Sequence, residues 1–134
     1  MLAFKHTDGG RAEAGYGVKV DAGDCTVRAI ALALDKPYEE AMQLCKSYGW
    51  TRAGRLSKAG IDKLLSDCGW QWAPYNAAKG EARVKLHTLS HRRCIARVSK
   101  HIVAVVDNCI LDNHDPRRAD TGGRCVYGIW EPVE

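Results

Sequence analysis

In the first half of the chain, apolar residues recur at helical spacing. They follow one another at steps of one, three and four residues at Val27, Ile30, Ala31 and Leu34, the pattern of one helix face. Asp24 precedes this run and is a good N-cap. Pro37 suits the first turn of a second helix over residues 38–48, and Ser57 is placed to cap a third helix ending near Gly69. The sequence therefore predicts three helices between residues 24 and 69.

After Gly69 the apolar residues alternate or form short runs, as in strands. We expect strands over residues 70–75, 94–98, 101–106, 109–113 and 124–130, and either a strand or a short turn over 83–89. Asp107 and Asn108 tolerate positive φ and predict a tight hairpin turn. Helices followed by hairpin-linked strands predict an α+β fold, in which N-terminal helices pack on a C-terminal antiparallel sheet.

Residues 1–22 are rich in glycine and show no regular period. We expect them to form an irregular N-terminal arm that lies over the core without being one of its elements. With 134 residues and no internal repeat, the chain has the length of a single domain over residues 1–134.

The chain lacks the apolar segments that membrane and secreted proteins carry. No apolar run approaches the roughly 18–20 residues that a membrane span needs, and the first residues do not form a signal peptide. We therefore expect a cytoplasmic protein without a membrane partner, in a reducing compartment that keeps its thiols free.

The six cysteines contain no Cys-x-x-Cys pair, so the zinc-finger and zinc-ribbon patterns are excluded. We predict neither a metal site nor a cofactor. Five of the cysteines occur in helix or strand patterns, where a free cysteine is usually a small buried apolar residue. These five are Cys45, Cys68, Cys94, Cys109 and Cys125.

The net charge of +4 favours no partner, but the basic residues are unevenly spread. Residues 83–106 contain six basic residues and no acid, at Arg83, Lys85, Arg92, Arg93, Arg97 and Lys100. Such a stretch attracts phosphate or an acidic substrate, although charge runs more often form a solvated face. Nucleic acid is therefore a partner to test, but not the favoured one.

Cys25 differs from the other cysteines because it opens the first predicted helix. The positive end of the helix dipole and the free N–H groups there favour a thiolate and lower the pKa of the thiol. The same N–H groups are suitable donors for a developing oxyanion. Arg28, about one turn later, either supports the thiolate or bridges to an acid, and we favour the bridge.

His101 begins the predicted hairpin. If Asp107 and Asn108 form a two-residue loop, His101 lies opposite His114, and Asp112 lies on the same face within diagonal reach of His101. A carboxylate there can accept from one imidazole nitrogen and leave the other to act on Cys25. Asn113 and Asp115 point to the other face unless a bulge shifts the register.

The chain resembles the papain-like cysteine peptidase superfamily in two runs. These are Gly-Asp-Cys-Thr-Val-Arg-Ala-Ile-Ala at residues 23–31 and the His-to-Asp-Pro hairpin at residues 100–116. The compact spacing resembles the bacteriocin-processing peptidase domains of bacterial exporters more than papain itself. The chain also resembles a group of short bacterial and phage proteins, which share these runs and those at residues 8–15 and 124–130.

The resemblance implies a papain-like fold and a Cys25–His101–Asp112 triad acting on a carbonyl group. Papain-like peptidases place a glutamine a few residues before the cysteine, and residues 17–22 contain none. Backbone amides or Lys19 are the substitutes within reach of such a site. Bacterial cell-wall peptidases of the same superfamily use a histidine as the third residue, and by that pattern His114 replaces Asp112.

The function that follows is hydrolysis of a peptide or isopeptide bond in a protein or peptide substrate. The first alternative is a catalytically silent papain-like binding module with a basic face for nucleic acid or a host protein. The second alternative is a cell-wall peptidase of the same superfamily.

Overall fold

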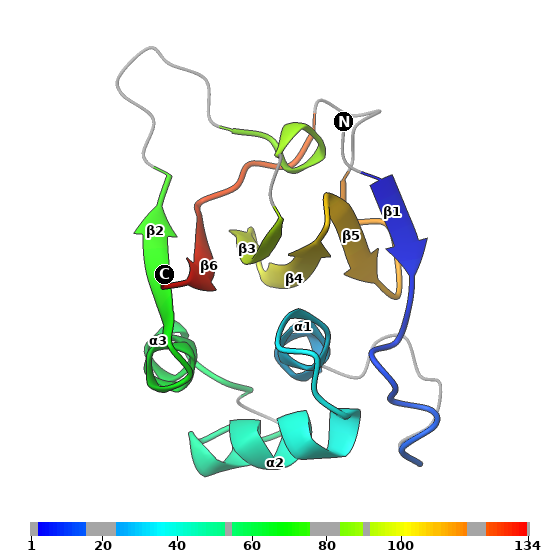
Figure 1. Ribbon diagram of the computed structural model, residues 1–134, viewed down its shortest axis with the longest axis vertical. Coiled ribbons are helices and arrows are strands. Elements are labelled where there is room, and N and C mark those ends of the chain that lie inside the picture. The colour runs from blue at the N-terminus through cyan, green and yellow to red at the C-terminus, as the bar shows by residue number, and fades with distance from the viewer. Residues whose placement is uncertain are drawn as a thin grey trace.

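The computed structural model describes residues 3–15, 24–52, 55–75, 84–89, 92–117 and 123–133 (Figure 1). Its helices are α1 (Cys25–Ala33), α2 (Tyr38–Ser47), α3 (Lys58–Asp67) and the short 3₁₀ helix η1 (Leu86–Thr88). Its strands are β1 (Ala3–His6), β2 (Trp70–Pro74), β3 (Arg93–Val98), β4 (His101–Val106), β5 (Cys109–Asp112) and β6 (Gly128–Pro132).

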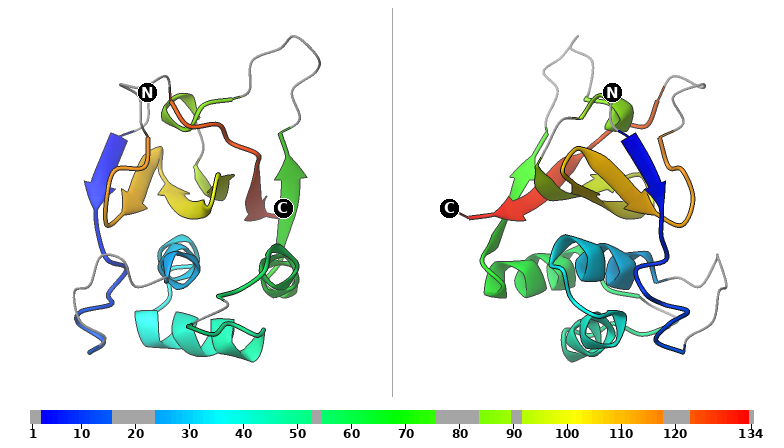
Figure 2. Two further views of the ribbon diagram at one scale, coloured as in Figure 1. Left: turned by 180° about the vertical axis from the view of Figure 1, so that it is seen from behind. Right: turned by 45° about the vertical axis from the view of Figure 1, so that its right-hand side comes forward.

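The six strands form one sheet in the order β1-β5-β4-β3-β6-β2, and the three α-helices cover one of its faces (Figure 2). Ile95, Ala104 and Trp130 are buried on the helix-covered face together with the inward side chains of α1, α2 and α3. A second buried apolar cluster, which includes Leu86 and Ile110, closes the opposite face. The predicted α+β class and the three helices are confirmed. Among the described helices, none combines the length and apolar character needed to cross a membrane.

The prediction of an irregular N-terminal arm is wrong for residues 3–6. These residues form β1, which pairs in parallel with β5 from Ala3 opposite Cys109 to His6 opposite Asp112. The Thr7 N–H continues the pairing with a 2.8 Å bond to the Asp112 carbonyl. The sheet is therefore mixed and not purely antiparallel, because the free edge of β5 offers backbone groups that β1 satisfies. Residues 16–22 of the predicted arm lie outside the described residues.

The hairpin between β4 and β5 has the predicted register. Asp107 and Asn108 both have positive φ, 52° and 58°, as a two-residue turn that matches the twist of its strands requires. Val106 pairs with Cys109, and Ala104 pairs with Leu111. The last predicted strand is shorter than expected, since β6 begins at Gly128.

Of two further predictions, the cap of α3 is confirmed and the burial of the cysteines is confirmed only in part. Ser57 caps α3 as predicted, accepting a hydrogen bond from the Gly60 N–H at 3.1 Å. All six cysteines are free. The prediction that five are buried is wrong for three of them, because only Cys45 and Cys94 are buried, while Cys68 is exposed and Cys109 and Cys125 are half-buried.

Candidate active site

Cys25 is the first residue of α1, the helix that packs across β4. Its thiol and the imidazole of His101 line one pocket of about 170 Å³. The first α-helical hydrogen bond of α1 is made by Arg28, whose N–H donates to the Asp24 carbonyl at 2.9 Å. The N–H groups of residues 25–27 therefore precede the helical hydrogen-bond ladder and form the positive end of the helix beside the thiol.

The environment of Cys25 favours its thiolate. Burial alone raises the pKa of the thiol, but hydrogen bonding to His101, the charge on His101, the Ile102 N–H and the charge on Arg28 outweigh it. The pKa of Cys25 is therefore lowered from its ordinary value. The sequence argument from the helix terminus predicted this direction, and the structure adds His101 as the largest favourable cause.

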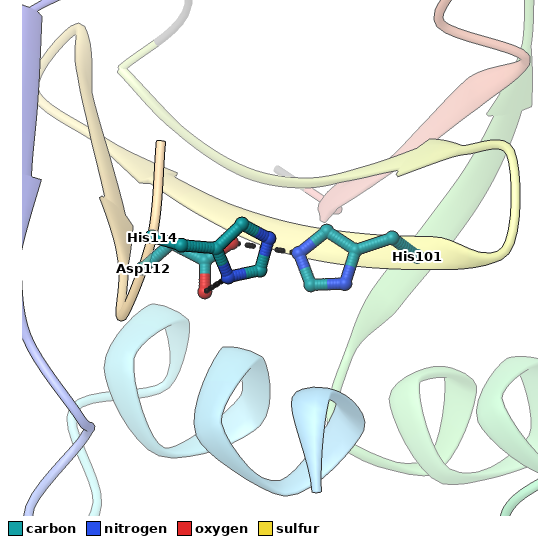
Figure 3. Close-up of side chains that lie close together, drawn as sticks. All are labelled: His101, Asp112 and His114. Carbon is teal, nitrogen blue, oxygen red and sulfur yellow. Dashed lines mark hydrogen bonds and ion pairs between the residues drawn. The ribbon is translucent and has the colours of Figure 1, made fainter. Parts of the chain in front are cut away.

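The second contact of His101 is with Asp112 (Figure 3). Its Nε2 lies 2.6 Å from Asp112 Oδ2, which leaves Nδ1 for the thiol. Burial lowers the pKa of His101, but the hydrogen bonds and charges of Asp112 and Cys25 prevail and raise it to about 9. The lowered pKa of the thiol and the raised pKa of the imidazole both favour transfer of the thiol proton to His101, which is the direction of a thiolate–imidazolium pair.

The hairpin register explains why these side chains meet. His101 opens β4 and Asp112 ends β5, two residues short of the position opposite His101, so the diagonal contact predicted from the turn is confirmed. The His114 ring lies 5.2 Å from that of His101, and its Nδ1 contacts Asn113 Oδ1 at 2.8 Å and lies 3.9 Å from Asp112 Oδ1. Asp115 forms an ion pair with Arg117. Of the four candidate third residues, Asp112 is the one that the structure places against His101.

Arg28 bridges two buried carboxylates, as predicted. Its Nη1 donates to Asp112 Oδ1 at 2.8 Å and its Nε donates to Asp24 Oδ1 at 3.0 Å. All three residues are at most 5% exposed. The guanidinium therefore fixes Asp112 relative to α1, and its charge also reaches Cys25.

Asp24 occupies the N-cap position of α1, but its side chain makes no capping hydrogen bond, so that part of the prediction is wrong. Its carboxylate instead accepts from Arg28, Tyr38 and Arg11, the last two at 2.7 and 2.8 Å. Three donors on one buried carboxylate compete successfully with the backbone, since each bond to a buried charge is strong. Tyr38 and Arg11 were not predicted as part of the site.

The N-terminal turn brings Arg11 to this network. Asp8 accepts hydrogen bonds from the N–H groups of Gly10 and Ala12 at 2.9 and 3.0 Å. Gly9 has a φ of +71°, and a Cβ there would lie 3.3 Å from the Arg28 Cα. The Asp-Gly-Gly-Arg run is thus a turn packed on Arg28. The sequence singles out this run but does not predict its contact with Arg28.

His101, Asp112 and His114 also bring three metal-ligating atoms within 4.8 Å of one another. The surroundings fit a cation poorly. Asp112 already accepts from the Arg28 guanidinium, and the raised pKa of His101 favours its protonated form, which cannot ligate a metal. The cluster is better explained as an orienting system for His101.

Among the described residues of the basic stretch, the side chains have different partners, and Arg83 lies outside the described residues. Lys85 Nζ lies 3.2 Å from Cys125 Sγ, and Arg93 donates to the Ala33 carbonyl. Arg97 and Lys100 instead line the pocket of Cys25. Lys19, the charged group considered for the oxyanion, lies outside the described residues.

Comparison of the chain with protein-family models, with curated proteins and with solved structures finds no match. The case for a function therefore depends on the geometry of the site.

We expect Asp112→Asn to lower the pKa of His101 from about 9, because the amide removes the negative charge beside Nε2. The change is measured by an NMR titration of the histidine rings. Asp115→Asn is the matched control, since Asp115 pairs with Arg117 and not with His101. An unchanged His101 titration in Asp112→Asn contradicts the assigned contact.

Proposed function

We propose that the protein is a cysteine-nucleophile hydrolase that cleaves a peptide or isopeptide bond. The observation that supports it best is the series of contacts from Asp112 to His101 and from His101 to Cys25. The Cys25 thiol has a lowered pKa and lines a pocket. Cys25 is the nucleophile, His101 the general acid and base, and Asp112 the residue that orients the imidazole. Cytoplasmic location, where the thiol stays reduced, is part of the proposal.

In the first half-reaction, the Cys25 thiolate attacks the carbonyl carbon and forms a C–S bond. The C–N bond then breaks, and the leaving amine takes the proton from the His101 imidazolium. In the second half-reaction, neutral His101 takes a proton from water, whose oxygen attacks the thioester carbon. The C–S bond breaks and yields a carboxylic acid and the starting thiolate–imidazolium pair.

The helix terminus supplies the charge stabilisation that this chemistry needs. The oxyanion that forms on the carbonyl oxygen is negative, and the N–H groups at the start of α1 lie beside the attacking sulfur. Such backbone donors stabilise tetrahedral intermediates, so they replace the glutamine that papain-like peptidases carry. The placement of α1 across the strand that bears His101 also supports a papain-like architecture.

A library of synthetic peptides, read by mass spectrometry for new termini, tests the proposal. We expect cleavage by the wild-type protein and loss of cleavage, by about 1,000-fold or more, in Cys25→Ala. Cys68→Ala is the matched control, because Cys68 is exposed and lies outside the pocket. Cleavage that persists in Cys25→Ala contradicts the assignment of the nucleophile.

The two alternatives give different results. A binding module for nucleic acid shows no cleavage, but an affinity that falls steeply with salt and is lost when Arg92 and Arg93 are neutralised. A cell-wall peptidase with His114 as its third residue loses activity in His114→Ala and keeps it in Asp112→Asn. We favour Asp112, because Asp112 contacts His101 Nε2 directly.

A further inference from the structure

The pocket beside Cys25 has a basic rim, which we define as Arg55, Lys58, Arg97 and Lys100. The described residues that line this pocket include no aspartate or glutamate. Its lining is otherwise mostly apolar and includes Leu56, Ile61, Val98 and Ile102. Positive groups around a small apolar space focus a positive potential on its contents.

The rim is assembled from two distant segments of the chain. Arg55 lies three residues before α3, and Lys58 is the first residue of that helix. Arg97 comes from the end of β3, and Lys100 from the turn into β4. Arg55 and Lys100 have left-handed backbone conformations, with φ of 56° each, and both are exposed. Both residues line the pocket.

Of the four cations of the rim, one forms an ion pair with a described residue. Lys58 pairs with Asp62 at 2.9 Å and lies 4.2 Å from the centre of the Trp72 ring. For Arg55, Arg97 and Lys100, the described part of the chain provides no ion-pair partner. Cations without an acidic partner among the described residues, placed beside a nucleophile, repel a cationic substrate and attract an anionic one.

We infer that the substrate carries a carboxylate beside the scissile carbonyl, as an acidic peptide does. This inference rests on the proposed function and specifies the substrate of the same site. A volume of about 170 Å³ suits a group the size of an amino-acid side chain. The carboxylate is that of an internal acidic residue or of a chain terminus, which share this chemistry.

Two alkylating reagents of similar size but different charge test the inference. Iodoacetate is an anion and iodoacetamide is neutral; with both, a C–S bond forms, the C–I bond breaks and iodide leaves. The measurement is the ratio of their rates at Cys25, located by peptide mass mapping at low salt. His101 contributes equally to this ratio in the wild-type protein and in variants of the rim, so differences between them report on the rim.

We expect Arg97→Gln and Lys100→Gln each to lower the iodoacetate-to-iodoacetamide ratio by about two- to fivefold, the effect of removing one charge several ångströms away. The double variant lowers it further, and added salt reduces the wild-type ratio. Arg92→Gln and Lys63→Gln are the controls, because both residues are exposed and outside the pocket. They leave the ratio unchanged.

The outcomes separate the inference from the proposed function. If iodoacetamide labels Cys25 rapidly but the variants of the rim keep the wild-type ratio, the inference is overturned and the hydrolase proposal stands. If Cys25 reacts with neither reagent faster than an ordinary thiol, the hydrolase proposal is overturned, and the inference with it.

The peptide library then distinguishes the two sources of the carboxylate. Cleavage beside internal aspartate or glutamate, lost when these become asparagine or glutamine, identifies an acidic side chain. Cleavage that requires a free terminal carboxylate, and is lost on amidation, identifies a chain terminus. Protection of Cys25 from iodoacetamide by a single-stranded oligonucleotide, but not by acidic peptides, overturns the inference in favour of nucleic acid.

Discussion

Iodoacetamide is expected to alkylate Cys25 at least tenfold faster than the exposed Cys68 at pH 6, and His101→Ala is expected to abolish this difference. An ordinary thiol of pKa about 8.5 is only about 0.3% thiolate at pH 6. The pKa of Cys25 is lowered by its interactions with His101, so a much larger fraction is thiolate. The lower nucleophilicity of a low-pKa thiolate reduces this gain but does not cancel it.

If the protein cleaves peptides as proposed, the same pair of groups sets the pH dependence of cleavage. Activity rises with pH through the lowered pKa of Cys25 as the thiolate forms. It falls again near pH 9, because the pKa of His101 is raised to about 9 and the leaving amine then has no proton donor. A bell-shaped profile is therefore expected, and Asp112→Asn moves its alkaline limb to lower pH.

Internal reference thiols make the labelling measurement decisive. Cys68 is exposed, and burial raises the pKa of both Cys45 and Cys94 to about 12, so these two react slowly. His114→Ala is expected to slow labelling less than His101→Ala, because His114 Nδ1 lies 3.9 Å from Asp112 Oδ1, whereas His101 hydrogen-bonds the Cys25 thiol itself. Equal rates at Cys25 and Cys68 in the wild-type protein would falsify the thiolate–imidazolium pair.

Arg28→Met is expected to lower the free energy of unfolding by about 3 kcal/mol, the largest stability effect expected at the site. The buried guanidinium joins Asp24 on α1 to Asp112 on β5. Methionine fills similar space, but each of the two buried carboxylates then loses its hydrogen bond and ion pair with the guanidinium. Urea denaturation followed by circular dichroism measures the change.

An exposed ion pair provides the control for Arg28→Met. Lys63 pairs with Asp67 at 3.3 Å on the surface of α3, and its side chain is 70% exposed. Lys63→Met is expected to change stability by less than about 1 kcal/mol, as surface pairs usually do. Arg28→Lys retains the positive charge but cannot make both hydrogen bonds. Its loss of stability is therefore expected to lie between those of Lys63→Met and Arg28→Met. An Arg28→Met protein as stable as the Lys63→Met protein contradicts the structural role of the network.

Arg28→Met is also expected to change the labelling rate of Cys25. Arg28 holds Asp112, which holds His101, and its charge also lowers the pKa of Cys25. The variant is therefore expected to label more slowly than the wild-type protein at pH 6 even where it remains folded.

Much of the fold and of the candidate site follows from local patterns. Helical spacing predicts α1, α2 and α3, because each helix buries one face regardless of what covers it. The Asp107-Asn108 turn fixes the register of β4 and β5, and with it the contact between His101 and Asp112. Cys25 at a helix start likewise follows from the pattern of a single element. These features depend on residues close together in the sequence.

The remaining features depend on contacts between distant segments, which no local period encodes. Residues 3–6 form a strand because the edge of β5 is free to pair with them. Asp24 binds Arg11, Arg28 and Tyr38 and does not cap its own helix. The basic rim exists because α3 and the β3–β4 turn meet at one pocket. The sequence alone determined the three helices and the pairing within the hairpin. The tertiary structure decided that residues 3–6 form a strand and which charged side chains share the space around Cys25, because both depend on how separate elements pack.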